Sequence, residues 1–167
     1  MLNLRLLPIL QNLKSALEGG LSHFEKLVGV SCGDNELLVR EVISQTLAMA
    51  GYDHRDLPWV GYLAADDTTA VVIGTCAFVN SPDATGLVEL AYYTFPSFEG
   101  RGYATAMAHH LVDLSVATHA VKDVVALTLP MANASTRVLE KVGFKRAGVA
   151  MDPDQGELWR WVFPVGS

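Results

Sequence analysis

The stretch PSFEGRGYATAM, residues 96–107, places a proline and two glycines directly before a helix-forming run. The residues before it, VELAYYTF (88–95), are rich in β-branched and aromatic side chains and predict a strand. After the glycines, apolar residues recur at the i, i+3, i+7 and i+10 positions of an amphipathic helix: Ala104, Met107, Leu111 and Leu114. The stretch therefore predicts a strand, a glycine turn and the N-terminus of a helix.

A junction of this kind suits an anionic ligand. The first turn of a helix has backbone N–H groups without partners, and the helix dipole adds partial positive charge there. Glycines let the backbone approach a phosphate or pyrophosphate closely. A tight connection that binds nothing is the alternative, because G-x-G alone is weak evidence and the stretch lacks the further residues of a Walker loop or a dinucleotide fingerprint.

Length and composition indicate one folded domain over residues 1–167. Half of the residues are hydrophobic and 18% are charged, which argues against a disordered chain. The formal net charge is −6 and no basic run is present, so we expect no nucleic-acid partner.

The cysteines and the N-terminus indicate the cellular compartment. Cys32 and Cys76 lie far apart without metal-ligand spacing, so we expect two reduced, buried thiols, with a disulfide as the alternative, and no metal site. The apolar N-terminus is interrupted by Arg5 and Pro8, and it predicts neither a signal peptide nor a membrane span. We therefore expect a cytoplasmic protein without a membrane partner.

The N-terminal third predicts one strand and three helices. A short strand covers 2–7, and helical patterns cover 8–17 and 21–28. A stronger helix begins after Asp34 as its N-cap and is closed by Gly51. Its apolar face is formed by Val39, Ile43, Leu47 and Ala50.

The next part of the chain predicts strands around the glycine turn. The runs 59–67, 69–79 and 87–95 are strand-like and are separated by turn residues, so they predict an antiparallel meander. After the long helix, the apolar run 123–129 predicts a buried strand parallel to the one before that helix.

A helix and a hairpin complete the chain. The helix covers 134–144, with Asn133 or Ser135 as its cap and Gly143 as its end. Two strand-like runs then flank DPDQG as a closing hairpin. This order of elements predicts a single α/β or α+β fold.

Two motifs in this order resemble the GNAT acetyltransferase superfamily, in its branch of ribosomal-protein-type N-acetyltransferases. The turn matches through Gly100, Gly102, Tyr103, Ala104 and Thr105, and the later helix matches through Ser135 and RVLEKVGF (137–144). The resemblance extends over about residues 88–144. It implies the GNAT fold: a mixed central sheet with an antiparallel meander, a parallel splayed strand pair and flanking helices.

The resemblance also implies acetyl-CoA as co-substrate. The turn 99–105 would hold the pyrophosphate, and the strand before it would pair with the pantetheine arm. The implied cofactor-binding residues are Tyr92, Tyr93, Thr94, Glu99, Gly100, Arg101, Gly102, Tyr103, Ala104, Thr105 and Asn133. Arg101 is also interpretable as a solvated loop residue.

Three positions depart from the family pattern. The Glu99 carboxylate is unfavourable beside a pyrophosphate, so we expect its side chain to turn to solvent. Ala132 stands where the family has asparagine, with Asn133 one place later. Leu139 replaces the tyrosine that many GNAT enzymes carry as proton donor to the thiolate.

The catalytic hypothesis rests on Glu89 and Ser135. Glu89 is the predicted general base, and its alternative role is to pair with a neighbouring cation; Glu157 is the weaker candidate. Ser135 is predicted to assist the leaving thiolate, and its alternative role is to cap the helix.

The resemblance thus implies an acetyl-CoA-dependent N-acetyltransferase that moves an acetyl group to a primary amine by direct attack. The acceptor is either a protein N-terminus or a small-molecule amine. The resemblance does not distinguish the two, because the parts of the chain that form the acceptor wall in this fold are the ones least similar to the family. The alternative function is a catalytically weak acyl-CoA-binding or sensor module. We expect a monomer or homodimer.

Overall fold

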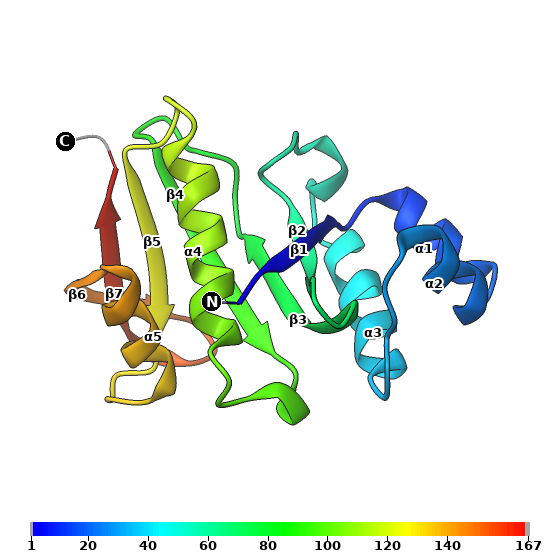
Figure 1. The fold of residues 1–167 in the computed structure, drawn as a ribbon. Helices are drawn as coiled ribbons and strands as arrows, with labels where there is room; N and C mark the ends of the chain where they lie inside the picture. Colours follow the sequence, from blue (N-terminus) through cyan, green and yellow to red (C-terminus); the bar gives the residue numbers. More distant parts are fainter. Residues whose placement is uncertain (1, 166–167) are drawn as a thin grey trace.

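A seven-stranded mixed sheet organises the part of the chain that the computed structural model describes, residues 2–165. Its strand order is β1-β2-β3-β4-β5-β7-β6 (Figure 1). The strands are β1 (Leu4–Pro8), β2 (Gly61–Asp66), β3 (Val71–Phe78), β4 (Leu87–Thr94), β5 (Asp123–Thr128), β6 (Lys145–Asp152) and β7 (Gly156–Pro164). Neighbouring strands are antiparallel except for β4 and β5, which are parallel. The predicted meander, parallel pair and closing hairpin are confirmed.

Helices cover both faces of this sheet. The helices are α1 (Gln11–Glu18), α2 (Leu21–Val28), α3 (Glu36–Leu47), α4 (Tyr103–Val116) and α5 (Ala134–Val142), with short 3₁₀ turns η1 (Tyr52–His54) and η2 (Pro96–Phe98). Figure 1 shows α4 crossing in front of β4, while α1, α2 and α3 gather beside β1, β2 and β3. In the described part of the chain, no helix is both long and apolar enough to span a membrane.

Each face has its own apolar core. Alternating side chains of the strands supply both cores, because successive residues of a strand point to opposite faces. The core under α4 and α5 contains Ile73, Leu90, Met107, Leu111 and Leu139. The core under α1, α2 and α3 contains Ile9, Phe24, Val39, Ile43 and Leu63. The sheet is therefore covered on both sides where β2 and β3 run.

The bounds of α3 differ from the prediction at both ends. Asn35, not Asp34, is the N-cap residue, and the helix ends at Leu47, before Gly51. The chain turns earlier because Tyr52 anchors the following segment: its hydroxyl donates to Ile9 O at 2.8 Å and accepts from Gly61 N at 2.9 Å. Tertiary contacts thus decide where this helix stops.

The parallel pair separates part of the way along. Within the described residues, β4 pairs with β5 only through Leu87, Val88 and Glu89, while β5 continues along β7 as far as Thr128. β4 stays paired with β3 up to Thr94. The β5-facing edge of β4 beyond Glu89 therefore keeps backbone groups that no strand uses. This is the splayed pair that the resemblance implies.

Candidate active site

A cleft of about 720 Å³ opens at the free edge of β4. It lies between the glycine turn, the N-terminus of α4 and the first turns of α5. It brings together most of the residues predicted to bind the cofactor: Tyr92, Tyr93, Thr94, Glu99, Gly100, Gly102, Tyr103, Ala104 and Thr105. Segments far apart in sequence thus form one cleft, which we call the β4–α5 cleft.

The glycine turn leaves space in front of its backbone. Gly100 and Gly102 have φ of 75° and 88°, in the left-handed region that favours glycine. A Cβ built on Gly100 would meet nothing within 4 Å, and one on Gly102 would meet only Leu2 Cδ1 at 3.5 Å. Gly102 is also the N-cap residue of α4. An anion can therefore approach the N–H groups of this turn and of the helix start.

Two predicted cofactor residues lie outside the walls of this cleft. The Arg101 guanidinium lies over the Phe98 ring, 5.6 Å from its centroid, and the side chain is exposed. Asn133 caps α5: its Oδ1 accepts from Thr136 N at 3.0 Å, and Thr136 Oγ1 accepts from Asn133 N at 2.9 Å. The polar groups of Asn133 are therefore engaged in the capping box.

Polar groups of the cleft fit a phosphorylated ligand with an amide-bearing arm. Arg137 and Lys141 line it and supply positive charge that the sequence analysis did not single out. The Thr94 hydroxyl is buried and has no hydrogen-bond partner among the described residues. Tyr103 is turned inward instead, since its hydroxyl donates to Asp66 Oδ2 at 2.6 Å and lowers the pKa of that carboxyl. The Tyr103 hydroxyl is thus already engaged in a hydrogen bond within the protein.

Ser135 contacts Tyr92 and does not cap α5. The Tyr92 Oη lies 3.1 Å from Ser135 Oγ and donates to Ser135 O at 3.3 Å. Burial raises the pKa of Tyr92, and the Ser135 contact opposes that shift. The alternative role of Ser135 as the cap is wrong, because Asn133 makes the cap hydrogen bond. Two hydroxyl groups therefore lie together in the cleft.

The Tyr92 hydroxyl is a further polar group that sequence reasoning missed. Tyr92 was expected to contribute through its backbone, and Leu139, at the usual tyrosine position, is buried in the core. The signal was the alternation along β4, where Val88 and Leu90 face the core beneath α4. Tyr92 has the same parity, so its ring points toward α5.

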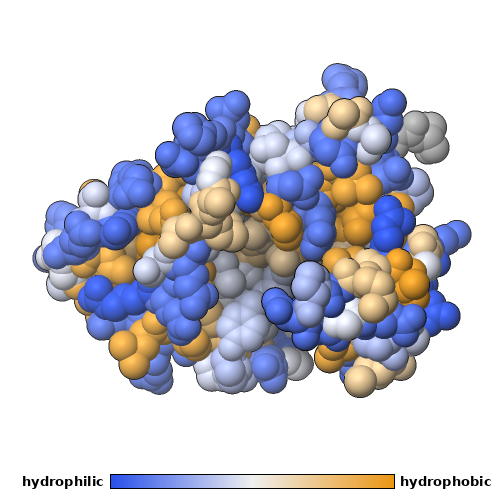
Figure 2. Space-filling view, turned by 180° about the vertical axis from the view of Figure 1, so that it is seen from behind, coloured by the Kyte–Doolittle hydropathy of each residue, from blue (hydrophilic) through white to orange (hydrophobic). Residues whose placement is uncertain are grey.

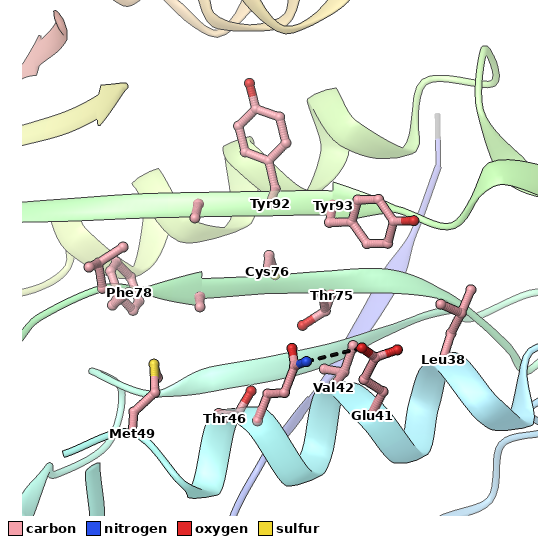
Figure 3. A pocket seen from close by; sticks show the side chains of 14 residues that line it. Leu38, Glu41, Val42, Thr46, Met49, Thr75, Cys76, Phe78, Tyr92 and Tyr93 are labelled. Atoms are coloured by element: carbon pink, nitrogen blue, oxygen red, sulfur yellow. Dashed lines mark hydrogen bonds between the residues drawn. The ribbon is translucent and has the colours of Figure 1, made fainter. Parts of the chain in front are cut away.

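A second cavity, about 510 Å³, lies on the opposite side of β3 and β4, against α3. We call it the α3 groove. Figure 3 shows Thr75 pointing toward α3 and the Tyr92 side chain standing on the far side of the strands. Both cavities reach Tyr92 and Tyr93. The cleft and the groove therefore meet on β4, where this strand leaves β5.

Glu89 lies on the groove side of β4. It has the same parity as Ala91 and Tyr93, which line the groove. Glu89 is half-buried, and burial raises its pKa. No Lys or Arg within residues 2–165 forms an ion pair with it, so the cation-pairing alternative finds no partner. Glu157, the weaker candidate, is exposed near the β6–β7 turn and lines neither cavity.

Comparison with known proteins identifies the class. Residues 34–145 match the acetyltransferase (GNAT) domain family, and the chain belongs to that family. The chain is an N-acetyltransferase, as this family, a homologous N-acetyltransferase and the structures similar to this one together indicate.

Individual relatives are distant in sequence. The chain is 24% identical over 124 residues to the uncharacterized N-acetyltransferase YjdG of Bacillus subtilis, covering 74% of this chain and 67% of that protein. Its fold is similar to RimL, a ribosomal L7/L12 α-N-protein acetyltransferase in complex with coenzyme A (TM-score 0.67, 13% identity, 98% and 94% of the two chains). It is also similar to aminoglycoside acetyltransferase AAC(6')-Ib in complex with coenzyme A and kanamycin (TM-score 0.63, 20% identity, 98% and 95%).

Proposed function

We propose that this protein transfers an acetyl group from acetyl-CoA to a primary amine by direct attack. The observation that carries the proposal is the meeting of two cavities at Tyr92 and Tyr93, where β4 separates from β5. One cavity has the features of a cofactor cleft and the other is free for an acceptor. The similar structures of RimL and AAC(6')-Ib, both in complex with coenzyme A, support coenzyme A as the ligand of this fold.

The β4–α5 cleft would hold acetyl-CoA through its backbone and its cations. The pyrophosphate would lie on the N–H groups of the turn 99–105 and the start of α4. Arg137 and Lys141 would offset its charge, and Glu99, which is exposed, would turn to solvent. The pantetheine arm would pair with the free edge of β4 from Tyr92 to Thr94.

The reaction forms one bond and breaks one. The neutral amine nitrogen attacks the thioester carbonyl carbon, and the N–C bond forms as the carbonyl electrons move onto oxygen. A backbone N–H of β4 would stabilise this oxyanion. When the carbonyl re-forms, the C–S bond breaks and its electron pair leaves with sulfur. Holding both partners side by side supplies much of the acceleration.

Two proton transfers complete the balance. Glu89, whose pKa is raised by burial, would act as the general base and take the proton that the amine nitrogen loses, through a water. The thiolate would take a proton from the Tyr92 hydroxyl, with Ser135 beside it. Tyr92 would thus be the proton donor in place of the family tyrosine, whose position in this chain is occupied by Leu139.

The test is release of CoA thiol in the presence of acetyl-CoA and a panel of amines and N-terminal peptides. We expect amine-dependent thiol release, and an increase in Tm with saturating acetyl-CoA by mass action on the folded state. An increase in Tm without thiol release for any acceptor would favour a binding or sensor module. No increase in Tm would contradict the assigned cofactor cleft.

A further inference from the structure

The α3 groove has one carboxylate in its lining and a second on the adjoining strand. Glu41 lines it, and Glu89 lies on the same face of the adjoining strand. Among the described residues, no Lys, Arg or His lines the groove. The cleft across the sheet is different, since Arg137 and Lys141 line it. The two cavities thus select opposite charges.

The walls of the groove are largely apolar, and several of them are uncovered. Leu38 and Val42 of α3 face Ala77 and Ala91 of the strands across it. Met49, Val79 and Tyr93 line it with 42%, 41% and 45% of their surface exposed. Figure 2 shows the molecule from behind, where apolar side chains border a hollow near the middle of that face. A volume of about 510 Å³ is that of a small-molecule site.

Two polar contacts of the groove are already made within the protein. Gln45 Nε2 donates to Glu41 Oε1 at 3.0 Å, as the dashed line in Figure 3 marks. The Thr75 hydroxyl donates to Tyr62 O at 2.7 Å. The other hydroxyls that line the groove belong to Thr46 and Tyr93, so polar groups are few beside the apolar side chains. A ligand rich in amide groups would therefore find few partners in the groove for the hydrogen bonds that it loses to water.

From this placement we propose that the acceptor is a small primary amine with an apolar body and no acidic group, such as an arylalkylamine. The inference rests on the proposed function and names its substrate class. The apolar body would cover the walls of the groove, and the ammonium group would be attracted by the two carboxylates. A free amino acid would bring a carboxylate to a site where the described residues place no cation, and burying an unpaired charge is costly.

The same argument separates this class from polyamines and peptides. A polyamine would bury further ammonium groups along apolar walls, where Glu41 is the one lining carboxylate among the described residues. A peptide N-terminus would bring backbone amides to a groove that offers few polar groups to pair with them. Both therefore serve as competing acceptors in the test.

The experiment compares matched acceptors by thiol release: 2-phenylethylamine, phenylalanine, phenylalaninamide, a phenylalanyl peptide and spermidine. Rates are expressed per concentration of unprotonated amine. We expect kcat/KM for 2-phenylethylamine to exceed that for phenylalanine by about tenfold or more, ~1.4 kcal/mol, with phenylalaninamide between them. A higher kcat/KM for phenylalanine, spermidine or the peptide overturns this acceptor class while acetyl transfer stands. No thiol release with any of them overturns both proposals.

A charge-placement pair of variants locates the effect. Met49→Lys puts a cation into the groove. We expect it to raise the ratio of kcat/KM for phenylalanine to kcat/KM for 2-phenylethylamine about tenfold. Leu37→Lys is the control, because Leu37 is 80% exposed on α3 and does not line the groove. An equal shift in both variants, or none in Met49→Lys, would overturn the placement of the acceptor in the groove.

Discussion

The β4–α5 cleft and the α3 groove share one strand and differ in almost everything else. The cleft has glycine backbone, a helix N-terminus and two cations, whereas the groove has apolar walls and the Glu41 carboxylate. The alternation of β4 turns Tyr92 toward the cleft and Tyr93 toward the groove. One strand can therefore hold two ligands of opposite charge and bring them together where it leaves β5. Substitutions in each cavity test this difference in function.

The largest expected effect lies on the groove side. Glu89→Gln should lower turnover by about 10²–10⁴-fold, the range for a positioned proton acceptor, and leave acetyl-CoA binding unchanged. The raised pKa of Glu89 means that the wild-type rate falls as pH decreases through that pKa, and the variant should lack this limb. Steady-state rates from about pH 6 to 9, with Glu157→Gln as control, measure it.

Stability separates a catalytic Glu89 from a structural one. Burial raises the pKa of this carboxyl, so its ionised form destabilises the native state as pH rises through that pKa. Glu89→Gln should therefore keep or raise Tm at neutral pH. A lower Tm with an unaltered rate profile would show that Glu89 only supports the fold.

The next effect lies in the cleft. Tyr92→Phe removes the hydroxyl beside Ser135, and turnover should fall about 10²-fold, the lower end of the range for general acid–base groups. KM for acetyl-CoA should change little. Ser135→Ala should cost less, and the double variant should be non-additive because the two hydroxyls are in contact. Additive losses would contradict a shared role in protonating the thiolate.

The glycine turn is tested through binding. Gly102→Val should raise the Kd for acetyl-CoA at least about tenfold, which removes ~1.4 kcal/mol of ligand stabilisation. The positive φ of Gly102 also strains any L side chain placed there. Gly20→Val, which introduces the same kind of strain away from the cleft, is therefore the control. Gly20 is likewise an N-cap residue with positive φ, 104°, and a Cβ there would meet nothing within 4 Å. Equal acetyl-CoA affinity in the two variants, by calorimetry, would contradict a phosphate site at the turn.

The smallest effect concerns the unpaired hydroxyl of Thr94. Thr94→Val should raise the Kd for acetyl-CoA about fivefold, ~1 kcal/mol for one hydrogen bond, because we expect this hydroxyl to rotate toward the pantetheine arm. Tm without ligand should stay the same or rise, since the hydroxyl has no partner within residues 2–165. A large loss of Tm with unchanged affinity would make Thr94 a purely structural residue.

Much of the fold could be predicted from sequence because its signals are local. Strand alternation, helix periodicity and glycine turns report on neighbouring residues, and they placed the meander, the parallel strand and the final hairpin. The predicted end of α3 was wrong, because the hydroxyl of Tyr52 forms hydrogen bonds with two backbone groups that are distant in the sequence. A local pattern carries no information on such contacts.

The sequence by itself determined the family of this protein, the order of its elements and the glycine turn, since all three are written in contiguous motifs. Only the tertiary structure decided that Asn133 and not Ser135 caps α5, and that Tyr92 contacts Ser135 from a strand 43 positions away. It also decided that Glu41 lines the groove, where residues 2–165 place no cation. These features depend on which side chains meet across elements. Packing in three dimensions sets those meetings, and no local period records them.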